Sequence, residues 1–177
     1  PRGEVKRHRP MTTTTIALWN AMTIPRLGIG TWVMGGKMWN NGIPVGWGAV
    51  DDAESLRALH TSFDMGIRFI DTADQYGGGH SEDVVGQAIR ESDVARDQLI
   101  VATKVGYLSS GETRNTYGES ADPDYVIEAV DASLKRLGLD YIDLYQFHLN
   151  GHDPQSADAV MGAFERLVEV GKIRAFG

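Results

Sequence analysis

The chain has 177 residues, 42% of them hydrophobic and 23% charged, a composition that suits one globular domain and excludes wholesale disorder. Its formal net charge of −7 argues against nucleic acid as a partner, because phosphate-backbone binding needs a basic face, and the lack of cysteine excludes disulfides, thiolate nucleophiles and Cys-ligated zinc. The apolar runs stop after about four residues, far short of the ~20 that a transmembrane helix needs, so we expect a soluble, cytoplasmic protein with no membrane partner.

Residues 1–24 differ from the rest of the chain, and we expect them to be irregular. Four of the first ten residues are basic, Thr12–Thr15 is a polar run, and the chain starts with Pro1 instead of methionine. The apolar stretch Ile16–Trp19 is shorter than the roughly 7–15 residues of a secretory signal. We interpret this lead as a cloning-derived segment or a misassigned start, with an organelle transit peptide as the alternative, and expect the domain to span 25–177.

Short apolar runs alternate with longer segments of helical period in the remainder of the chain. This alternation predicts parallel strands joined by crossover helices, hence an α/β fold with five strands and four helices. The expected strands are Arg26–Thr31, Ile67–Asp71, Leu99–Thr103, Tyr141–Gln146 and Ile173–Phe176.

Helix start and stop signals lie between these strands. The first helix is expected after Asp51 and Glu54, which are spaced as a capping box, with its apolar stripe reaching Ile67. Ser81 is expected to cap the second helix. The third should begin at Asp122 with proline in its first turn, and the fourth should cover residues 157–170.

Polar side chains follow three of the strands at the point where each strand ends. Asp71 ends the second strand and is followed by Asp74 and Tyr76, while Lys104 and His148 follow the third and fourth strands. The carboxyl ends of parallel strands in a β/α barrel share one rim, which is where active sites form. Each residue alone has an ordinary structural explanation, but a lysine and an aspartate at the ends of apolar strands are costly unless they pair.

The chemistry of this group suits proton transfer to a carbonyl oxygen. A tyrosine phenol has a pKa of about 10, and a neighbouring ammonium stabilises its phenolate. Lys104 would supply that charge, Asp71 would hold Lys104 in place, and His148 would donate a hydrogen bond to a substrate oxygen.

Five segments of the chain share order and spacing with a known family. They are RLGIGTW (Arg26–Trp32), GIRFIDTADQYG (Gly66–Gly77) with GHSE (Gly79–Glu82), LIVATKVG (Leu99–Gly106), LKRLGLDYIDLYQFH (Leu134–His148) and GKIRAFG (Gly171–Gly177). These segments resemble the aldo/keto reductase family. The resemblance implies a (β/α)₈ TIM barrel that reduces aldehydes and ketones with NADPH, less often NADH.

The resemblance also assigns roles to residues. It implies Asp71, Tyr76, Lys104 and His148 as the catalytic residues, with Tyr76 as the general acid. It places Gly30, Thr31, Trp32 and Asp71 beside the nicotinamide ribose or the substrate pocket. The insertion from Met34 to Gly48 resembles the bacterial and channel-subunit-like branches more than the sugar-reductase branch.

Other functions remain open at this stage. Lys104 at a strand end also suits a Schiff-base aldolase, and the filled catalytic positions are compatible with a cofactor-sensing or interaction subunit that turns over slowly. A metal site at His148, His152 and Asp153 is disfavoured, because the intervening Asn-Gly and the following Pro154 indicate a loop, so no metal is expected. Trp32, Trp39 and Trp47 would either line a substrate pocket or pack.

The number of strands is the main departure from the family pattern. A (β/α)₈ barrel needs eight strands and eight helices, about 250 residues in all, whereas five strands and four helices are predicted here. We therefore expect a truncated barrel that holds the proton-transfer residues and about half of the cofactor site, and that binds NADPH weakly when alone. The exposed edges of the first and fifth strands are expected to favour self-association.

Overall fold

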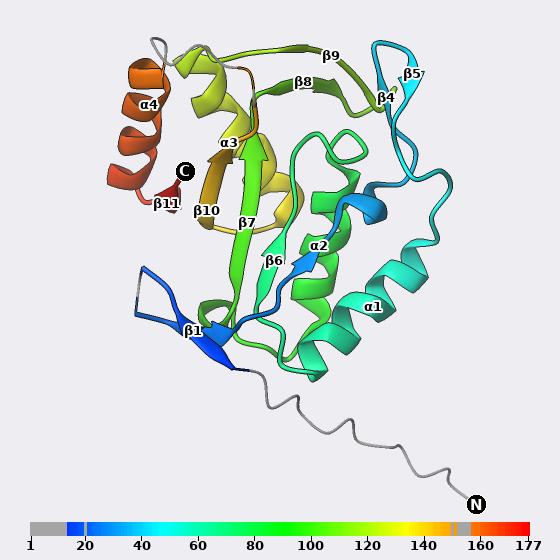
Figure 1. Cartoon of the computed structure of the whole chain (residues 1–177), viewed down its shortest axis with the longest axis vertical. Coiled ribbons are helices and arrows are strands. Elements are labelled where there is room, and N and C mark those ends of the chain that lie inside the picture. Colours follow the sequence, from blue (N-terminus) through cyan, green and yellow to red (C-terminus); the bar gives the residue numbers. More distant parts are fainter. Residues whose placement is uncertain (1–13, 20, 150, 152–156) are drawn as a thin grey trace, which may run out of the picture.

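The centre of the structure is a sheet of five parallel strands. The structure is a computed structural model, and it describes residues 14–19, 21–149, 151 and 157–177. Figure 1 shows β7 in the middle of this sheet, with β10 on one side and β6 on the other. The strand order is β11-β10-β7-β6-β3, with bounds Ile173–Phe176, Ile142–Phe147, Ile100–Val105, Phe69–Asp71 and Ile29–Gly30.

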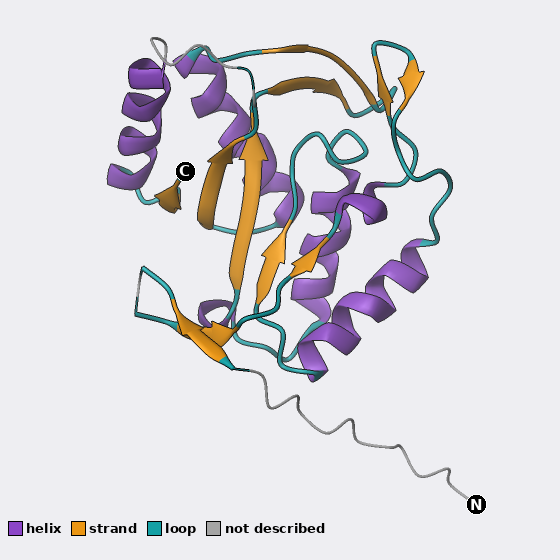
Figure 2. Cartoon of the chain, viewed as in Figure 1, coloured by secondary structure: helices purple, strands orange, loops and turns teal. Residues whose placement is uncertain are grey.

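Four helices alternate with these strands, as the sequence predicts. Neighbouring helices contact one another in chain order, and they follow each other around the sheet (Figure 2). Their bounds are α1 Asp52–Asp64, α2 His80–Glu91, α3 Pro123–Leu137 and α4 Ala157–Glu169. None of the described helices is long and apolar enough to cross a membrane.

The predicted helix caps are confirmed for α3 and partly wrong for α1 and α2. Asp122 accepts a hydrogen bond from the Asp124 N–H, 2.9 Å away, and Pro123 occupies the first turn. Asp51 caps α1 as predicted. The helix ends at Asp64, however, so Ile67, the last residue of the expected apolar stripe, lies beyond it.

Two further expectations about these caps are corrected. Glu54 pairs with Arg57 instead of completing a capping box. The residue before α2 is Gly79, which has a φ of +98°, a value that glycine adopts without strain. Ser81 lies inside the first turn and is fully buried. A buried hydroxyl in the first turn is free to bond to other elements of the fold.

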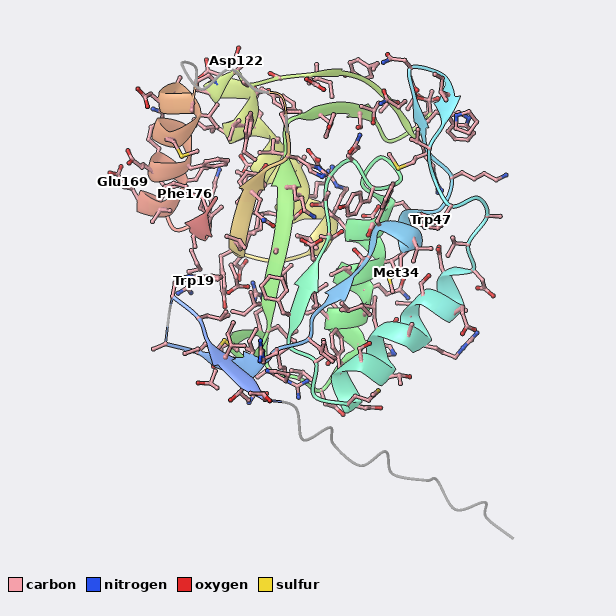
Figure 3. The ribbon with its side chains drawn as sticks, in the orientation of Figure 1. Trp19, Met34, Trp47, Asp122, Glu169 and Phe176 are labelled. Carbon is pink, nitrogen blue, oxygen red and sulfur yellow. The ribbon has the colours of Figure 1, made fainter. Side chains whose placement is uncertain are left out.

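One apolar core fills the layer between the sheet and the helices (Figure 3). Tyr145 of β10 meets Phe164 of α4 edge to face, with ring centroids 5.6 Å apart. The absence of a side chain at Gly86 lets α2 lie against the end of α3. A Cβ at this position would collide with the carbonyl oxygen of Leu137.

Part of the expected irregular lead is regular. Strands β1 (Thr15–Ala17) and β2 (Thr23–Pro25) form an antiparallel hairpin, and Ile24 is buried with 4% exposure. The expectation of an irregular segment is therefore wrong for this part. Residues 1–13 lie outside the described residues.

A second sheet lies at the carboxyl ends of the parallel strands, and the sequence did not predict it. Its order is β5-β4-β9-β8, with bounds Ile43–Pro44, Trp39–Asn40, Asn115–Glu119 and Tyr107–Ser110. The insertion at residues 34–48 supplies β4 and β5, while β8 and β9 follow β7 (Figure 1). This sheet brings Tyr107 to the rim where the candidate catalytic residues meet.

Candidate active site

Lys104 is the centre of a hydrogen-bonded group at the ends of β6 and β7. Its Nζ donates to Asp71 Oδ2 at 2.9 Å, to the Thr72 carbonyl oxygen at 2.7 Å and to the Tyr76 hydroxyl at 3.2 Å. The Lys104 side chain is 12% exposed and that of Asp71 is 36% exposed. A lysine in this position needs the pairing that the sequence predicted.

Strand register explains why these residues meet. Asp71 lies opposite Ala102 on β7, and Lys104, two residues further on, points to the same face of the sheet. The loop after β6 then returns Tyr76 to the Lys104 ammonium. His148 is held at the end of β10, where its backbone N–H donates to the Val105 carbonyl oxygen at 2.8 Å.

His148 is neutral at pH 7. Burial lowers its pKa to about 4, the nearby Lys104 ammonium acts in the same direction, and Asp71 opposes them. The imidazole lies edge-on to Tyr76, with ring centroids 5.9 Å apart, and Nδ1 has no hydrogen-bond partner among the described residues. A neutral imidazole beside a phenol suits hydrogen bonding to a polar ligand.

A cavity of about 240 Å³ opens next to these groups. Trp32 stacks on Tyr76 with ring centroids 6.1 Å apart and forms one wall, while Trp47 lies edge-on to Trp32 at 5.7 Å. The lining residues are Trp32, Met38, Asn40, Val45, Gln75, Tyr76, Tyr107 and His148. Of the three tryptophans considered from the sequence, only Trp32 lines this cavity, and Trp39 lines a separate hollow with Pro44.

Three buried hydroxyl groups support the site, and sequence reasoning missed their role. The Thr31 hydroxyl donates to the Asp71 carbonyl oxygen at 3.0 Å. The Ser81 hydroxyl lies 2.8 Å from that of Thr31 and 3.0 Å from that of Thr72. All three residues have no exposed surface, so α2 is bonded to Thr31 at the end of β3 and to Thr72, the residue after Asp71. The GHSE segment is the sequence signal at this position, and its place at a helix start predicts a cap instead of a support for the site.

The remaining candidate positions differ in accessibility. Gly30 lies opposite Asp71 and is exposed, and a Cβ there would meet no heavy atom within 4 Å. This leaves open space beside the Asp71 carboxylate. No group of three or more metal-binding side chains occurs in the described part of the chain, and His152 and Asp153 lie outside it.

Comparison with known proteins shows the family of the chain. A sequence profile of the Aldo/keto reductase family matches residues 26–177. The chain belongs to the aldo/keto reductase family. The chain is also similar to Aldo-keto reductase YhdN of Bacillus subtilis, with 40% identity over 153 residues that cover 86% of this chain and 42% of that protein.

Other members of the family agree on the fold and differ in the cofactor named. An aldo-keto reductase from Klebsiella pneumoniae, solved in complex with NADPH, is 32% identical with a TM-score of 0.71 over 94% of this chain and 49% of that one. The NADH-specific methylglyoxal reductase of Escherichia coli is 35% identical over 95% of this chain and 50% of that protein. The five strands therefore correspond to part of the (β/α)₈ barrel of these relatives, and the aldo/keto reductase chain spans about half the length of the curated relatives it matches.

Proposed function

We propose that this aldo/keto reductase chain carries the proton-transfer part of an enzyme that reduces aldehydes or ketones to alcohols with NADPH. The observation that carries the proposal is the 3.2 Å hydrogen bond between Lys104 Nζ and the Tyr76 hydroxyl, at the edge of the 240 Å³ cavity. Tyr76 is the proton donor in this proposal. The Lys104 ammonium stabilises the phenolate that remains after transfer, and Asp71 holds the ammonium in place.

The polar groups of the site fit a carbonyl oxygen. The Tyr76 hydroxyl and an N–H of neutral His148 are both hydrogen-bond donors, and a carbonyl oxygen accepts two hydrogen bonds. These donors stabilise the charge that develops on the oxygen. Tyr76 then transfers its proton to this oxygen, which completes the alcohol.

The residues on this side of the site also fit a nicotinamide ring. NADPH supplies the hydride when bound. The open space at Gly30 and the exposed edge of Trp32 leave room beside Asp71. Thr31 is fully buried, so we propose that it supports Asp71 instead of contacting the cofactor. The choice of NADPH over NADH is supported by the NADPH complex of the Klebsiella relative.

The test is NADPH oxidation by the purified chain, followed at 340 nm with a panel of aldehydes and ketones. We expect slow turnover, because the chain spans about half the length of its relatives. The rate of the variant Tyr76→Phe should be at least about 100-fold lower than that of the unchanged chain, because the variant lacks the general acid. Tyr117→Phe, a change at an exposed tyrosine, is the matched control.

Two results would contradict the proposal. One is an unchanged rate in Tyr76→Phe, and the other is the absence of both turnover and any quenching of NADPH fluorescence on binding. A Schiff-base aldolase through Lys104 is disfavoured, because its Nζ already bonds to Asp71, to the Thr72 carbonyl oxygen and to the Tyr76 hydroxyl. Borohydride trapping with a carbonyl substrate would reveal an adduct on Lys104 if that alternative were correct.

We also propose that the isolated chain self-associates through its sheet edges. Strands β3 and β11 are the two edges of the five-stranded sheet in the described residues, and such edges pair with other chains. The cytoplasmic location and the slow-turnover sensing role stay predictions from sequence.

A further inference from the structure

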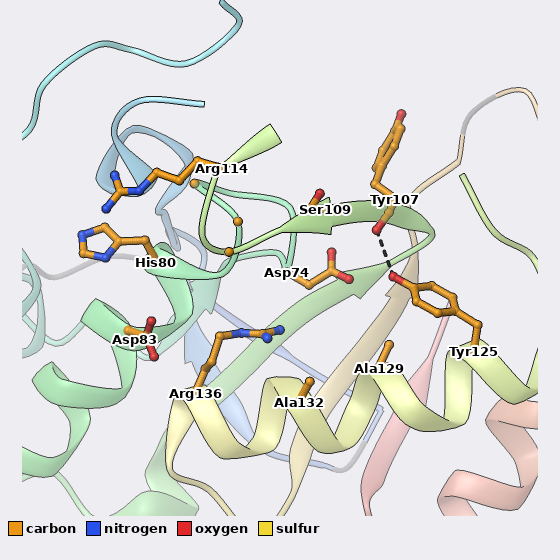
Figure 4. A pocket seen from close by; sticks show the side chains of 13 residues that line it. Asp74, His80, Asp83, Tyr107, Ser109, Arg114, Tyr125, Ala129, Ala132 and Arg136 are labelled. Atoms are coloured by element: carbon orange, nitrogen blue, oxygen red, sulfur yellow. Dashed lines mark hydrogen bonds between the residues drawn. The ribbon is translucent and has the colours of Figure 1, made fainter. Parts of the chain in front are cut away.

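The loop that carries Tyr76 from β6 to α2 borders two cavities. Gln75 and Tyr76 line the catalytic cavity of about 240 Å³, while Asp74 and Gly78 line a larger cavity of about 500 Å³. Figure 4 shows the larger cavity, with Asp74 in its lining. Side chains that face empty space lack packing contacts on that side. Packing alone therefore does not fix the place of Tyr76.

Three glycines follow Tyr76 and give the loop backbone little rigidity of its own. Gly77, Gly78 and Gly79 have φ angles of +64°, +65° and +98°, a region that other residues rarely adopt. Because they lack a Cβ, these glycines also have many other conformations open to them. The end of the loop at α2 consequently needs contacts with the rest of the fold to hold Tyr76 in place.

Ser81, in the first turn of α2, supplies such contacts. Its backbone N–H donates to the Tyr76 carbonyl oxygen at 3.2 Å. Its hydroxyl donates to Thr31, whose carbonyl oxygen lies at 2.9 Å and whose hydroxyl lies at 2.8 Å. The Thr72 hydroxyl is 3.0 Å from the same Ser81 oxygen. Ser81 thus joins α2 to the ends of β3 and β6 and to the backbone of Tyr76.

The number of protons fixes the direction of this hydroxyl chain. A serine or threonine hydroxyl has one proton to donate. Thr31 donates its proton to the Asp71 carbonyl oxygen at 3.0 Å, and Ser81 donates its own to Thr31. The Thr72 hydroxyl is therefore the donor to Ser81. An alanine in place of Ser81 would break the chain in its middle and remove the acceptor of a buried hydroxyl, which is costly.

The residues bonded to Ser81 are the residues that hold Lys104. The Lys104 ammonium has three protons, and it donates to the Asp71 carboxylate, the Thr72 carbonyl oxygen and the Tyr76 hydroxyl. Ser81 is bonded to Thr72 through its hydroxyl and to Tyr76 through its backbone. It reaches Asp71 through one further hydroxyl group. Each acceptor of Lys104 therefore belongs to a residue that Ser81 holds.

We propose that Ser81 is a positioning residue that keeps the Tyr76 hydroxyl within hydrogen-bond reach of the Lys104 ammonium. Ser81 is fully buried and lines neither cavity, so it acts through these two residues and not on a substrate. The consequence for catalysis rests on the proposed role of Tyr76 as proton donor. The link between Ser81 and Lys104 rests on the hydrogen bonds alone.

The first test is steady-state NADPH oxidation by Ser81→Ala. Its kcat should be at least about tenfold lower than that of the unchanged chain, while KM for the carbonyl substrate stays within about twofold, because misplaced proton-transfer groups affect the transition state more than substrate binding. Thr72→Val removes the first donor of the same hydroxyl chain. This variant should lower kcat in the same direction, and it replaces Ser81→Ala if that variant does not fold.

Ser55→Ala is the matched control. Ser55 is also buried near the start of a helix, with 5% exposure, and its hydroxyl donates to the Asp51 carbonyl oxygen at the N-cap of α1. The variant loses a buried hydroxyl group as Ser81→Ala does, but its kcat should be unchanged. Equal losses of kcat in Ser55→Ala and Ser81→Ala would show a general effect of lost stability and overturn the proposal.

The second test needs neither NADPH nor turnover. The NMR signal of Lys104 Nζ is recorded in an isotope-labelled chain through the Cε protons, and it is identified by its absence in Lys104→Met. Ser81→Ala and Thr72→Val should shift this signal, and Ser55→Ala should not. An unshifted signal in both site variants would overturn the role of Ser81. An unchanged rate in Tyr76→Phe would instead contradict the proposed reduction, so the two failures are distinguishable.

Discussion

The imidazole of His148 shows how single residues of this site depend on their surroundings. In the folded chain its pKa is about 4, because of burial and the Lys104 ammonium, whereas a solvated histidine has a pKa of about 6.5. The unfolded chain therefore binds more protons than the folded chain between these two values. The contribution of His148 to the free energy of unfolding consequently rises with pH across this window. The same contribution is lost as the pH falls from 6.5 to 4.

We predict that His148→Gln makes the chain less sensitive to acid. Between pH 7.5 and pH 4.5 the variant should lose about 1–2 kcal/mol less stability than the unchanged chain, since solvent screens part of the effect at a half-buried group. Urea unfolding at both pH values measures this. The pH 7.5 value is the control for the packing cost of the substitution, and equal pH dependence in both chains would refute the prediction.

Backbone contact between elements depends on glycine at the crossing of α2 and α3. A side chain at Gly86 has no room, because a Cβ would collide with the Leu137 carbonyl oxygen, which is backbone and cannot move aside. Gly162 on α4 is the opposite case, since the nearest atom to a Cβ there is the Arg166 side chain, 3.9 Å away. The same residue type thus has a packing role in one helix and none in another.

We predict opposite effects of the same substitution in these two helices. Gly86→Ala should destabilise the chain by about 2–3 kcal/mol, because overpacking separates α2 from α3. Gly162→Ala should stabilise it by roughly 0.5–1 kcal/mol, because alanine has the higher helix propensity. Thermal and urea unfolding of both variants test the pair, and a neutral Gly86→Ala would show that the helices do not approach as closely as described.

At the largest scale, the open edge of β11 is the feature on which the proposed self-association depends. Gly177 donates to the Tyr145 carbonyl oxygen at 3.2 Å, and its own carbonyl accepts from the Phe147 N–H at 2.7 Å. Because neighbouring residues of a strand bond to opposite sides, the N–H group of Phe176 points to the open edge.

We predict that Phe176→Pro suppresses self-association without breaking the pairing of β11 with β10. Proline removes an N–H group from the open side only. Sedimentation velocity over a hundredfold range of concentration should show association of the unchanged chain and of Phe176→Ala, and a monomer for Phe176→Pro. Both variants lose the ring contact with Phe164, so they differ only in the N–H group. A monomer at every concentration in all three chains would contradict the proposed self-association.

Local patterns in the sequence determined the five parallel strands, the four helices and the meeting of Asp71, Tyr76, Lys104 and His148. This was sufficient because apolar runs, helix caps and the shared edge of parallel strands depend on residues close in sequence and on one rule of sheet geometry. Long-range contacts alone account for the second sheet, in which Trp39 pairs with Asn115, and for the place of the Ser81 hydroxyl beneath the candidate active site. These contacts join residues far apart in the chain, and no local pattern of apolar or polar residues encodes which distant partner each one meets.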